Sequence, residues 1–488
     1  MGAKLREAGI DSFTIYERSD GVGGTWHDNT YPGAQCDVPS HFYSFSFALN
    51  PDWSMTYADQ PEIRAYLDAC TDRLGLRPHL RSGSAVRELR WDDDAMVWRL
   101  HLDDGTPDGD DVSADVVVSA LGMLNVPAYP DIAGLDEFAG PVFHSARWDH
   151  DVDLAGRRVA VIGTGASAIQ FVPEIAPVVD RLHVFQRSAP WIMPKMLRPY
   201  TDGERRRFRH VPLAARRERW KHFWQFERNT SVHTADEATA QRTRWATKFL
   251  AHAVPDGELR TRLTPDYPIG CKRLLLSNDY FPALSLPQVE LVTDGIDRVT
   301  PTGVVTSDGH ERDVDVIILG TGFRASDHLS GIDVYGRGGR SLHEDWSDGA
   351  SAYLGIAVGG FPNFFILYGP NTNQGGNSII FVLEAQVHHV MGAIRRITRR
   401  RRPLEVRRIV QERDARRVQR DMAGTLWLSG CSNYFTDRNG RVTTQYPHSA
   451  LHYWARVRLL RPGAYRLLRR DGRTVARPSG GTAGRVRG

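Results

Sequence analysis

Two motifs follow each other closely in the middle of the chain: Phe138-x-Gly140-xxx-His144-xxx-Trp148-Asp149, and then Gly163-Thr164-Gly165-Ala166-Ser167-Ala168. The second motif comes directly after Arg158 to Ile162, whose apolar pattern predicts a short buried strand. Its first glycine permits a tight turn, its second lets the backbone approach a pyrophosphate, and its alanine lets the next helix pack close to the sheet. The phosphates would bind at that helix's N-terminal amides. The pattern therefore predicts a dinucleotide-binding unit in mid-chain, and hence a redox enzyme with a further segment before this unit.

The end of the next predicted strand, Leu182 to Phe185, indicates which dinucleotide binds. An NAD-binding unit usually carries an acid there for the ribose 2′-hydroxyl. This chain has Gln186 and Arg187 instead. A planar guanidinium suits a 2′-phosphate because it binds phosphate oxygens through two hydrogen bonds. The sequence therefore favours NADPH over NADH.

Length and composition are those of an ordinary globular protein with two or three domains. The chain has 488 residues, of which 41% are hydrophobic and 25% charged, with a net charge of +4. No apolar run approaches the roughly 20 residues that span a bilayer, and no signal-peptide pattern opens the chain. Arginine clusters occur at 205–207 and 399–402, but acidic runs elsewhere in the chain balance their charge. The clusters also lack the interleaved aromatic residues of a nucleic-acid-binding surface, so they are typical of a solvated surface.

The four cysteines indicate a reducing compartment. Cys36, Cys70, Cys271 and Cys431 have neither the spacing of a metal site nor that of a disulfide framework. We therefore expect no metal, four reduced thiols and a cytoplasmic protein.

The first segment has the pattern of half of a second dinucleotide unit. Ser12 to Tyr16 predicts a strand that ends before Glu17, in the position of an acid that binds a ribose. Such an acid lies roughly 20 residues after the glycine loop, which places that loop before Met1. We interpret the chain as beginning downstream of the first strand and phosphate loop of an FAD-binding unit. A start codon assigned too far downstream would explain why this strand and loop are missing. On position alone, Glu17 could equally be a surface acid.

Together these motifs resemble the class B flavin monooxygenases and, within them, the Baeyer–Villiger monooxygenases. The resemblance extends from Lys4 to about Trp454, and the absent N-terminal Gly-x-Gly-x-x-Gly is its one departure. The matching segments, beyond the two motifs above, are Gly23-Gly24-Thr25-Trp26, Tyr31-Pro32-Gly33-Ala34-Gln35-Cys36-Asp37, Lys272-Arg273 and Gly320-Thr321-Gly322-Phe323.

The resemblance implies an α/β fold with two Rossmann-like domains, one of them inserted into the other. The FAD domain would be formed by residues 1–150 and 321–475, and the NADPH domain by residues 151–320, with a helical insertion at about 203–260. Residues 476–488 would form a disordered tail.

The resemblance also implies a reaction. NADPH reduces the flavin, O₂ adds to give a C4a-peroxyflavin, and the peroxide attacks a ketone, which rearranges to an ester or lactone. The peroxide must stay anionic to attack, so the site needs a fixed positive charge, and an arginine supplies one because it does not deprotonate. By similarity this residue is Arg273, oriented by Asp37. His144 is expected to act as a hinge residue between the domains and not as a proton donor.

Further residue roles follow from the same resemblance. The FAD site would comprise Glu17, Gly24, Thr25, Trp26, Asp37, Tyr43, Val86 and Ile379. The NADPH site would comprise Gln35, Cys36, Asp37, Gly163 to Ala168, Gln186, Arg187, Lys272 and Arg273. The long fingerprint consists of Phe138, Gly140, His144, Trp148 and Asp149.

Two other functions stay open from the sequence. A related oxygenase could act on an amine or sulfide, which attacks a protonated hydroperoxide and needs no arginine; Asp37 together with Arg273 argues against it. Alternatively, the chain could be an inactive NADPH-binding protein, because the first glycine loop is missing. An in-frame strand and glycine loop in the DNA upstream of Met1 would exclude this alternative. The partners are expected to be a small ketone and O₂.

Overall fold

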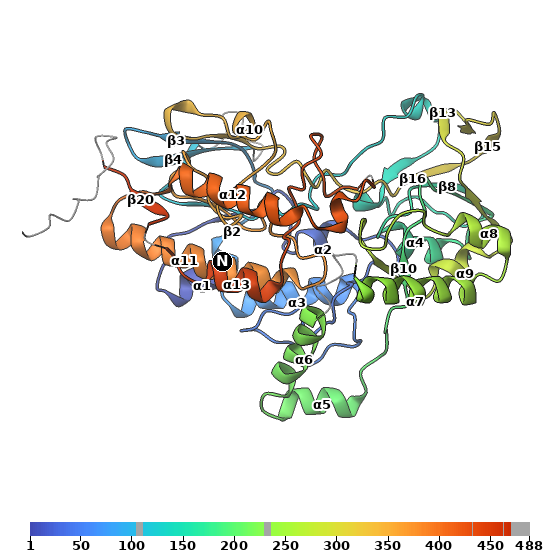
Figure 1. The fold of residues 1–488 in the computed structure, drawn as a ribbon, viewed down its shortest axis with the longest axis horizontal. Coiled ribbons are helices and arrows are strands. Elements are labelled where there is room, and N and C mark those ends of the chain that lie inside the picture. The colour runs from blue at the N-terminus through green and yellow to red at the C-terminus, as the bar shows by residue number, and fades with distance from the viewer. Residues whose placement is uncertain (104–110, 229–235, 432, 462, 470–488) are drawn as a thin grey trace, which may run out of the picture.

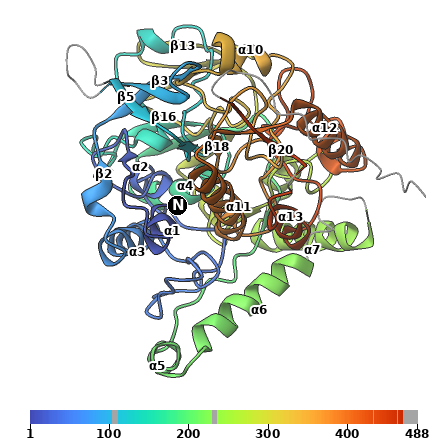
Figure 2. The ribbon, with the colours of Figure 1, turned by 90° about the vertical axis from the view of Figure 1, so that its left-hand side faces the viewer.

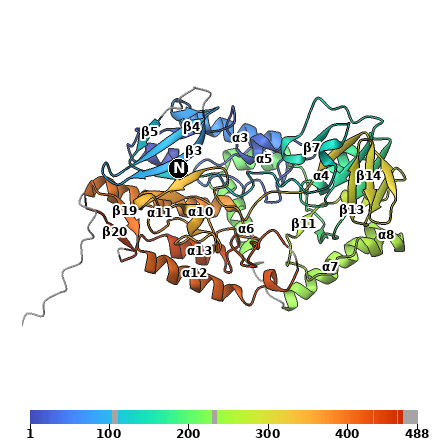
Figure 3. The ribbon, with the colours of Figure 1, turned by 90° about the horizontal axis from the view of Figure 1, so that it is seen from above.

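In the computed structural model, which describes residues 1–103, 111–228, 236–431, 433–461 and 463–469, the chain forms two halves that lie side by side along the longest axis (Figures 1 and 3). One half contains a five-stranded sheet near the middle of the sequence. The other half is assembled from both ends of the chain. The predicted tail, 476–488, lies outside the described residues.

The five-stranded sheet is parallel throughout, with the order β12-β9-β8-β16-β7. Its two central strands, β8 and β16, are almost fully buried apolar runs, as expected when both faces of a parallel sheet are covered. Helices α4 (Ala168–Ile175) and α9 (Tyr280–Leu284) pack together in the core against it. The strands are β7 (Val142–His144), β8 (Arg158–Ile162), β9 (Arg181–Phe185), β12 (Val289–Val292) and β16 (Val316–Leu319).

The predicted strands of this sheet agree closely with the structure, but the predicted domain boundary does not. Strand β7 precedes residue 151 and forms one edge of the sheet, so this half begins earlier than expected. A small antiparallel sheet, β13 (Ile296–Thr300), β14 (Gly303–Thr306) and β15 (Glu311–Asp313), fills the connection from β12 to β16.

The other half contains several small sheets beside long helices. Strand β1 (Ile15–Tyr16), shorter than expected, pairs with β2 (Leu80–Arg81), and β6 (Val117–Ser119) pairs with β18 (Phe364–Ile366). A mixed sheet has the order β17-β3-β4-β5, and β19 pairs with β20. The bounds are β3 (Ala85–Asp92), β4 (Val97–Asp103), β5 (Asp111–Ala114), β17 (Asp333–Tyr335), β19 (Leu404–Val406) and β20 (Tyr465–Leu467).

Helix α11 (Ile379–Arg400) is the main helix of this half, and its apolar face lies in a core shared with α13 (Ala450–Val457). Because α11 and α13 come from the C-terminal part and Leu5 of α1 (Gly2–Glu7) joins the same core, both chain ends build one unit. The remaining helices are α2 (Thr25–Asp28), α3 (Gln60–Arg73), α10 (Leu342–Asp345) and α12 (Arg408–Met422).

The predicted helical insertion is present as α5 (Asp202–His210), α6 (Ala214–Arg228), α7 (Glu237–Ala253) and α8 (Gly257–Arg262). Helix α5 extends away from the body at the end of α6 (Figure 2). The insertion is flanked by β10 (Ile192–Met193) and β11 (Leu275–Leu276), which pair in parallel.

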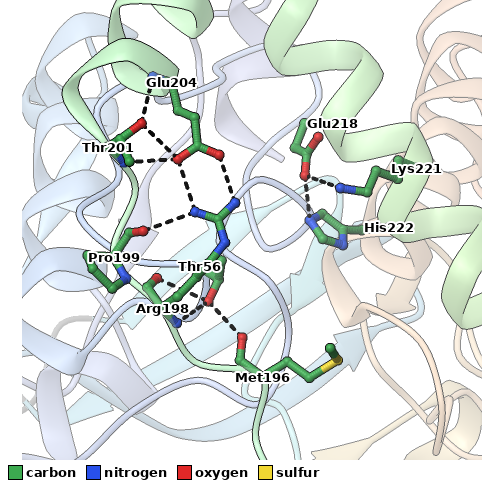
Figure 4. Close-up of polar contacts among 9 residues, drawn as sticks. All are labelled: Thr56, Met196, Arg198, Pro199, Thr201, Glu204, Glu218, Lys221 and His222. Carbon is green, nitrogen blue, oxygen red and sulfur yellow. Dashed lines mark hydrogen bonds and ion pairs between the residues drawn. The ribbon is translucent and has the colours of Figure 1, made fainter.

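Polar contacts tie the start of the insertion to the N-terminal segment (Figure 4). The Arg198 guanidinium contacts both Glu204 carboxylate oxygens, at 3.0 and 2.7 Å. The Thr56 hydroxyl donates to the carbonyl oxygens of Met196 and Arg198 and accepts from the Arg198 amide. The insertion is therefore fixed to both halves. None of the helices that the structure describes is both long and apolar enough to cross a bilayer.

The cysteine prediction is wrong for one pair. Cys271 and Cys431 form a disulfide across 160 residues of sequence, whereas Cys36 and Cys70 are buried free thiols. Spacing along the chain gave no sign of the pair, because the two sulfur atoms meet only when the halves come together.

Candidate active site

A cavity of about 2100 Å³ lies between the two halves. Pockets for single drug-sized ligands measure roughly 300–1,000 Å³, so this cavity has room for more than one large ligand. Both halves line it: segments 23–26, 34–38, 120–124 and 373–377 from one, and 162–167, 185–188 and 272–276 from the other.

The turn after β8 forms one wall. Gly163 has φ 108°, and a side chain there would meet the Gly320 carbonyl oxygen at 2.5 Å. Gly165 has open space, since the nearest atom to an added Cβ is 3.9 Å away, and Ala168 is fully buried under Gly320. The residues from Gly163 to Ser167 line the cavity directly before α4. This geometry suits a pyrophosphate at a helix N-terminus, as the motif predicts.

At the end of β9, the positive charges of Arg187 and Lys272 gather at the cavity wall. Gln186, Arg187 and Ser188 line the cavity beside Lys272, whose Nζ donates to the Ser188 Oγ at 2.7 Å. Partial burial and the neighbouring Arg187 guanidinium lower the pKa of Lys272. Two nearby cations beside a hydroxyl fit an anionic group such as a 2′-phosphate.

Arg273 and Asp37 form an ion pair inside the cavity. Arg273 Nη2 donates to Asp37 Oδ2 at 2.8 Å, although 236 residues separate the two in sequence. Burial opposes the charge on Arg273, but Asp37 and the neighbouring tyrosines, Tyr434 and Tyr368, outweigh it and raise the pKa of the guanidinium. The Arg273 side chain is 40% exposed within this open cavity. The result is a permanent cation that faces the cavity.

A second cation approaches the same carboxylate. Lys195 Nζ lies 3.8 Å from Asp37 Oδ1, and the Lys195 side chain is only 5% exposed. Burial lowers the pKa of Lys195, while Asp37 opposes that shift. Asp37 therefore connects two positive groups, of which Arg273 faces the cavity.

The loop that carries Asp37 is held against α4. Gln170, on the first turns of this helix, accepts from the Tyr31 hydroxyl at 2.9 Å and donates to the Gln35 carbonyl at 2.9 Å. Gln35 and Cys36 line the cavity, and burial raises the pKa of the Cys36 thiol to about 12. Loop 31–37 thus belongs to one half by sequence and is positioned by the other.

The other half of the molecule contributes residues predicted for FAD to the cavity lining. Gly24, Thr25, Trp26, Tyr43 and Ile379 all line the cavity. Gly24 has φ 53°, and nothing lies within 4 Å of a Cβ added there. Trp26 Nε1 donates to the Tyr43 hydroxyl at 3.0 Å, with the rings edge-to-face. An open glycine turn beside two fixed aromatic rings fits a flat isoalloxazine.

Two residues predicted for FAD lie outside this cavity lining. Glu17 Oε1 accepts from the nearby Ser19 amide at 2.8 Å. Val86 lies on β3 opposite Leu102 and packs against the core of that sheet. The structure does not bring either residue to the cavity wall.

The fingerprint residues surround β7 and do not line the cavity. His144, at the end of β7, is 1% exposed, and burial lowers its pKa to about 4. Its ring lies between Tyr129 and Phe323, on the two segments that connect the halves. Trp148 packs on Phe143 and Phe171.

The other three fingerprint residues have structural surroundings. Phe138 packs against the core beneath the sheet. A side chain at Gly140 would meet the Asp315 carbonyl at 2.4 Å, and Asp149 accepts from the Asp151 amide. The fingerprint therefore shapes the connection between the halves.

The sequence reasoning missed three residues of the site. Gln170 fixes the Asp37 loop, Lys195 approaches Asp37, and Tyr434 lies against Arg273. Gln170 could have been found, because it lies directly after the glycine motif. Lys195 and Tyr434 carry no local signal, since their role depends on distant partners.

Comparison with known proteins identifies the family. Residues 7–203 match the family described as flavin-binding monooxygenase-like. A Baeyer–Villiger monooxygenase of Pseudomonas aeruginosa is 44% identical over 471 residues, 96% of this chain and 89% of that protein. The chain belongs to the flavin-binding monooxygenases, and within them to the Baeyer–Villiger type.

Solved structures agree with this assignment. An oxidised steroid monooxygenase bound to NADP matches with a TM-score of 0.84 and 31% identity, over 96% of each chain. A cyclohexanone monooxygenase, 27% identical, matches over 95% of this chain and 96% of its own in two forms: closed, with a TM-score of 0.84, and open, with 0.82. The predicted α/β architecture with two dinucleotide-binding domains is thereby confirmed.

Proposed function

We propose that this chain is an FAD-containing, NADPH-dependent monooxygenase that inserts one oxygen atom into a ketone. A ketone, O₂, NADPH and a proton give an ester or lactone, water and NADP⁺. The observation that carries the proposal is the Arg273–Asp37 pair, 2.8 Å apart, inside a cavity lined by residues suited to both dinucleotides. FAD, when bound, accepts hydride from NADPH and activates O₂.

The residues of the chain supply positioning and charge. Arg273 holds a positive charge where negative charge develops on the reacting oxygen, and a fixed charge of this kind is among the larger catalytic contributions. Asp37 orients the guanidinium and helps to keep it protonated. Gln170 holds the loop of Asp37 in register with the nucleotide turn.

The two cofactors would be bound by cavity residues from different halves of the molecule. Gly163 to Ser167 would hold the NADPH pyrophosphate, while Lys272 and Arg187 would bind its 2′-phosphate. Gly24, Thr25, Trp26, Tyr43 and Ile379 would contact the flavin. The buried, neutral His144, placed between the two connecting segments, is proposed as a hinge residue.

The substrate is proposed to be a small-molecule ketone, and the location the cytoplasm, where NADPH is available. An amine or sulfide oxygenase is the competing activity. Such soft nucleophiles need no stabilised anion, so the Arg273–Asp37 pair favours the ketone.

The test offers the holoenzyme a ketone and a thioether together, and measures ester, sulfoxide and NADPH consumption. In Arg273→Ala we expect ester formation to fall by about 10²–10³-fold, because one preorganised charge is removed, while the flavin is still reduced. The control is Arg157→Ala, an exposed arginine of the same half outside the cavity. Unchanged ester formation in Arg273→Ala, or sulfoxide as the main product of the native enzyme, would refute the proposal.

A further inference from the structure

The Cys271–Cys431 disulfide joins two segments that come from different halves of the molecule. Cys271 follows the helical insertion and Cys431 follows α12. Their Cα atoms are 6.4 Å apart, within the range of roughly 4.4–6.8 Å that a disulfide bridges.

Each cysteine is anchored in its own half by its neighbours. On one side, Ile269 lies in a buried cluster with Trp191, and the Leu275 amide donates to the Trp191 carbonyl at 3.0 Å. On the other side, Trp427 and Phe435 share a buried cluster with residues of α12. The bond therefore crosses the boundary between two separately packed units.

The disulfide also lies beside the proposed catalytic arginine. Cys271 is two residues before Arg273, and Cys431 is three residues before Tyr434, which helps to raise the pKa of Arg273. The other partner of Arg273, Asp37, belongs to the N-terminal segment. If the half that carries Arg273 moved away, the guanidinium would lose both partners at once.

A relative of the same architecture, a cyclohexanone monooxygenase, has been solved in open and closed forms. A covalent bond at this boundary limits how far the two halves can separate. Its effect is largest close to the bond, which is where Arg273 lies.

We propose that the Cys271–Cys431 disulfide is a redox-dependent tie that positions Arg273 for oxygen transfer; this inference rests on the proposed function. In the oxidised form, the tie keeps Arg273 at Asp37 and Tyr434. A dithiol reductant opens it by exchange: two electrons and two protons pass to the cysteines, and the reductant becomes a disulfide. The reduced enzyme still oxidises NADPH, but more of the oxygen leaves as hydrogen peroxide.

The chemistry of the site allows the tie to form again. Two cysteine thiols and one hydrogen peroxide give the disulfide and two water molecules, and peroxide is what uncoupled turnover releases. Cys271 is fully buried whereas Cys431 is half-buried, so exchange would begin at the Cys431 sulfur. Disulfides in a reducing compartment are most often of this reversible kind.

The first measurement counts thiols in the holoenzyme. Protein treated with peroxide, and protein treated with a phosphine reductant, are each denatured in an alkylating agent and mapped by mass spectrometry. We expect label on Cys36 and Cys70 alone after peroxide, and on all four cysteines after reduction. Label on Cys271 and Cys431 after peroxide would overturn the proposal.

The second measurement is the ester formed per NADPH consumed. Reduction of the disulfide should lower this ratio by about tenfold, because a small displacement of a positioning group lowers the reaction rate by that factor or more. Cys431→Ser should have the low ratio in both redox states, and Cys70→Ala, a buried thiol outside the cavity, should respond to reduction as the native enzyme does.

The outcomes separate the tie from the proposed function. Equal ratios in the oxidised and reduced enzyme would refute the tie alone. If no ester forms in either redox state, the proposed function fails. Small-angle X-ray scattering then tests whether the disulfide holds the two halves together. Expansion on reduction in the native protein, absent in Cys431→Ser, would support it, whereas identical scattering in both states would refute it.

Discussion

At the scale of single residues, Lys272 is the group whose charge should depend most on the bound nucleotide. Partial burial lowers its pKa first, and the neighbouring Arg187 lowers it further. Its hydrogen bond goes to the neutral Ser188 hydroxyl. Asp266 opposes both effects, and a bound 2′-phosphate would add a further anion and raise the pKa of Lys272 again.

The sign of the resulting pH dependence follows from this shift. Below its lowered pKa, Lys272 is charged with or without nucleotide, and binding of the 2′-phosphate is at full strength. As pH rises through that pKa, the free protein loses the proton and must regain it to bind. We therefore expect the KM for NADPH to rise with pH already below the ordinary lysine pKa of 10.5, while the KM for NADH, which lacks the 2′-phosphate, stays flat.

Steady-state kinetics with both nucleotides across this range check the expectation. Lys272→Met should raise the KM for NADPH by about tenfold or more at neutral pH, since a hydrogen bond to a charged group is worth roughly 1.5–3 kcal/mol, and should remove its pH dependence. A parallel rise for NADPH and NADH in the native enzyme would contradict the assigned role.

At the scale of elements, the turn from β8 to α4 uses its two glycines for different reasons. Gly163 combines φ 108° with the Gly320 carbonyl 2.5 Å from where a Cβ would lie. Gly165 has an ordinary backbone conformation and space around it. The first glycine is needed to fold the turn, and the second leaves room for a ligand.

We expect the two alanine variants to separate these roles. Gly163→Ala should destabilise the protein by about 1–3 kcal/mol, because its backbone conformation is strained for any other residue, and should lower its Tm. Gly165→Ala should keep the native Tm but bind NADPH more weakly, since its methyl group would occupy the space for the pyrophosphate. Thermal unfolding and nucleotide titration measure the two effects. Equal losses of Tm would disprove the distinction.

At the scale of the whole molecule, the segment before the insertion fastens the two halves together. The Tyr200 amide donates to the Ser54 carbonyl and the Thr56 amide to the Arg198 carbonyl, which forms a short contact between the halves. Arg198 then pairs with Glu204 of α5, where Glu204 and Thr201 form a capping box. This contact and the disulfide lie on different segments, so the halves are joined at more than one place.

Glu204 gives this contact a pH dependence. Arg198, and then the Thr201 amide, lower the pKa of Glu204 to about 2. Because the pKa of Glu204 is lower in the folded protein than in the unfolded chain, its charge stabilises the fold at pH values above the usual glutamate pKa of 4.5. This stabilisation is lost as the pH falls from 4.5 to about 2. Because the side chain is partly exposed, we expect Glu204→Gln to cost only about 0.5–1 kcal/mol at neutral pH and nothing at low pH.

Glutamine keeps the capping box while alanine removes it, which provides the matched comparison. Glu204→Ala should therefore cost more than Glu204→Gln at both pH values, and limited proteolysis of α5 should follow the same order. Equal stability of the two variants at neutral pH would mean that the capping box contributes nothing.

The sequence by itself determined the central sheet, the nucleotide turn and the family. These features are local: a buried strand, a glycine turn and a helix start lie within a few residues, so their spacing is visible along the chain. For the same reason the strands predicted at 158–162 and 182–185 lie close to the observed β8 and β9. The boundary at 150 was predicted too late, because β7 joins its sheet through pairing with β16, which lies far along the chain.

Only the tertiary structure decided what surrounds Arg273. Asp37 and Tyr434 meet it from two distant segments, Lys195 approaches Asp37 from a third, and the sequence named Asp37 only through family resemblance. The disulfide was missed and the cysteines were expected to be reduced, because pairing over 160 residues depends on how two halves dock and not on spacing. Glu17 and Val86 were assigned by resemblance, and the structure places both outside the cavity wall. Contacts between segments are set by the packing of whole units, which a local pattern does not encode.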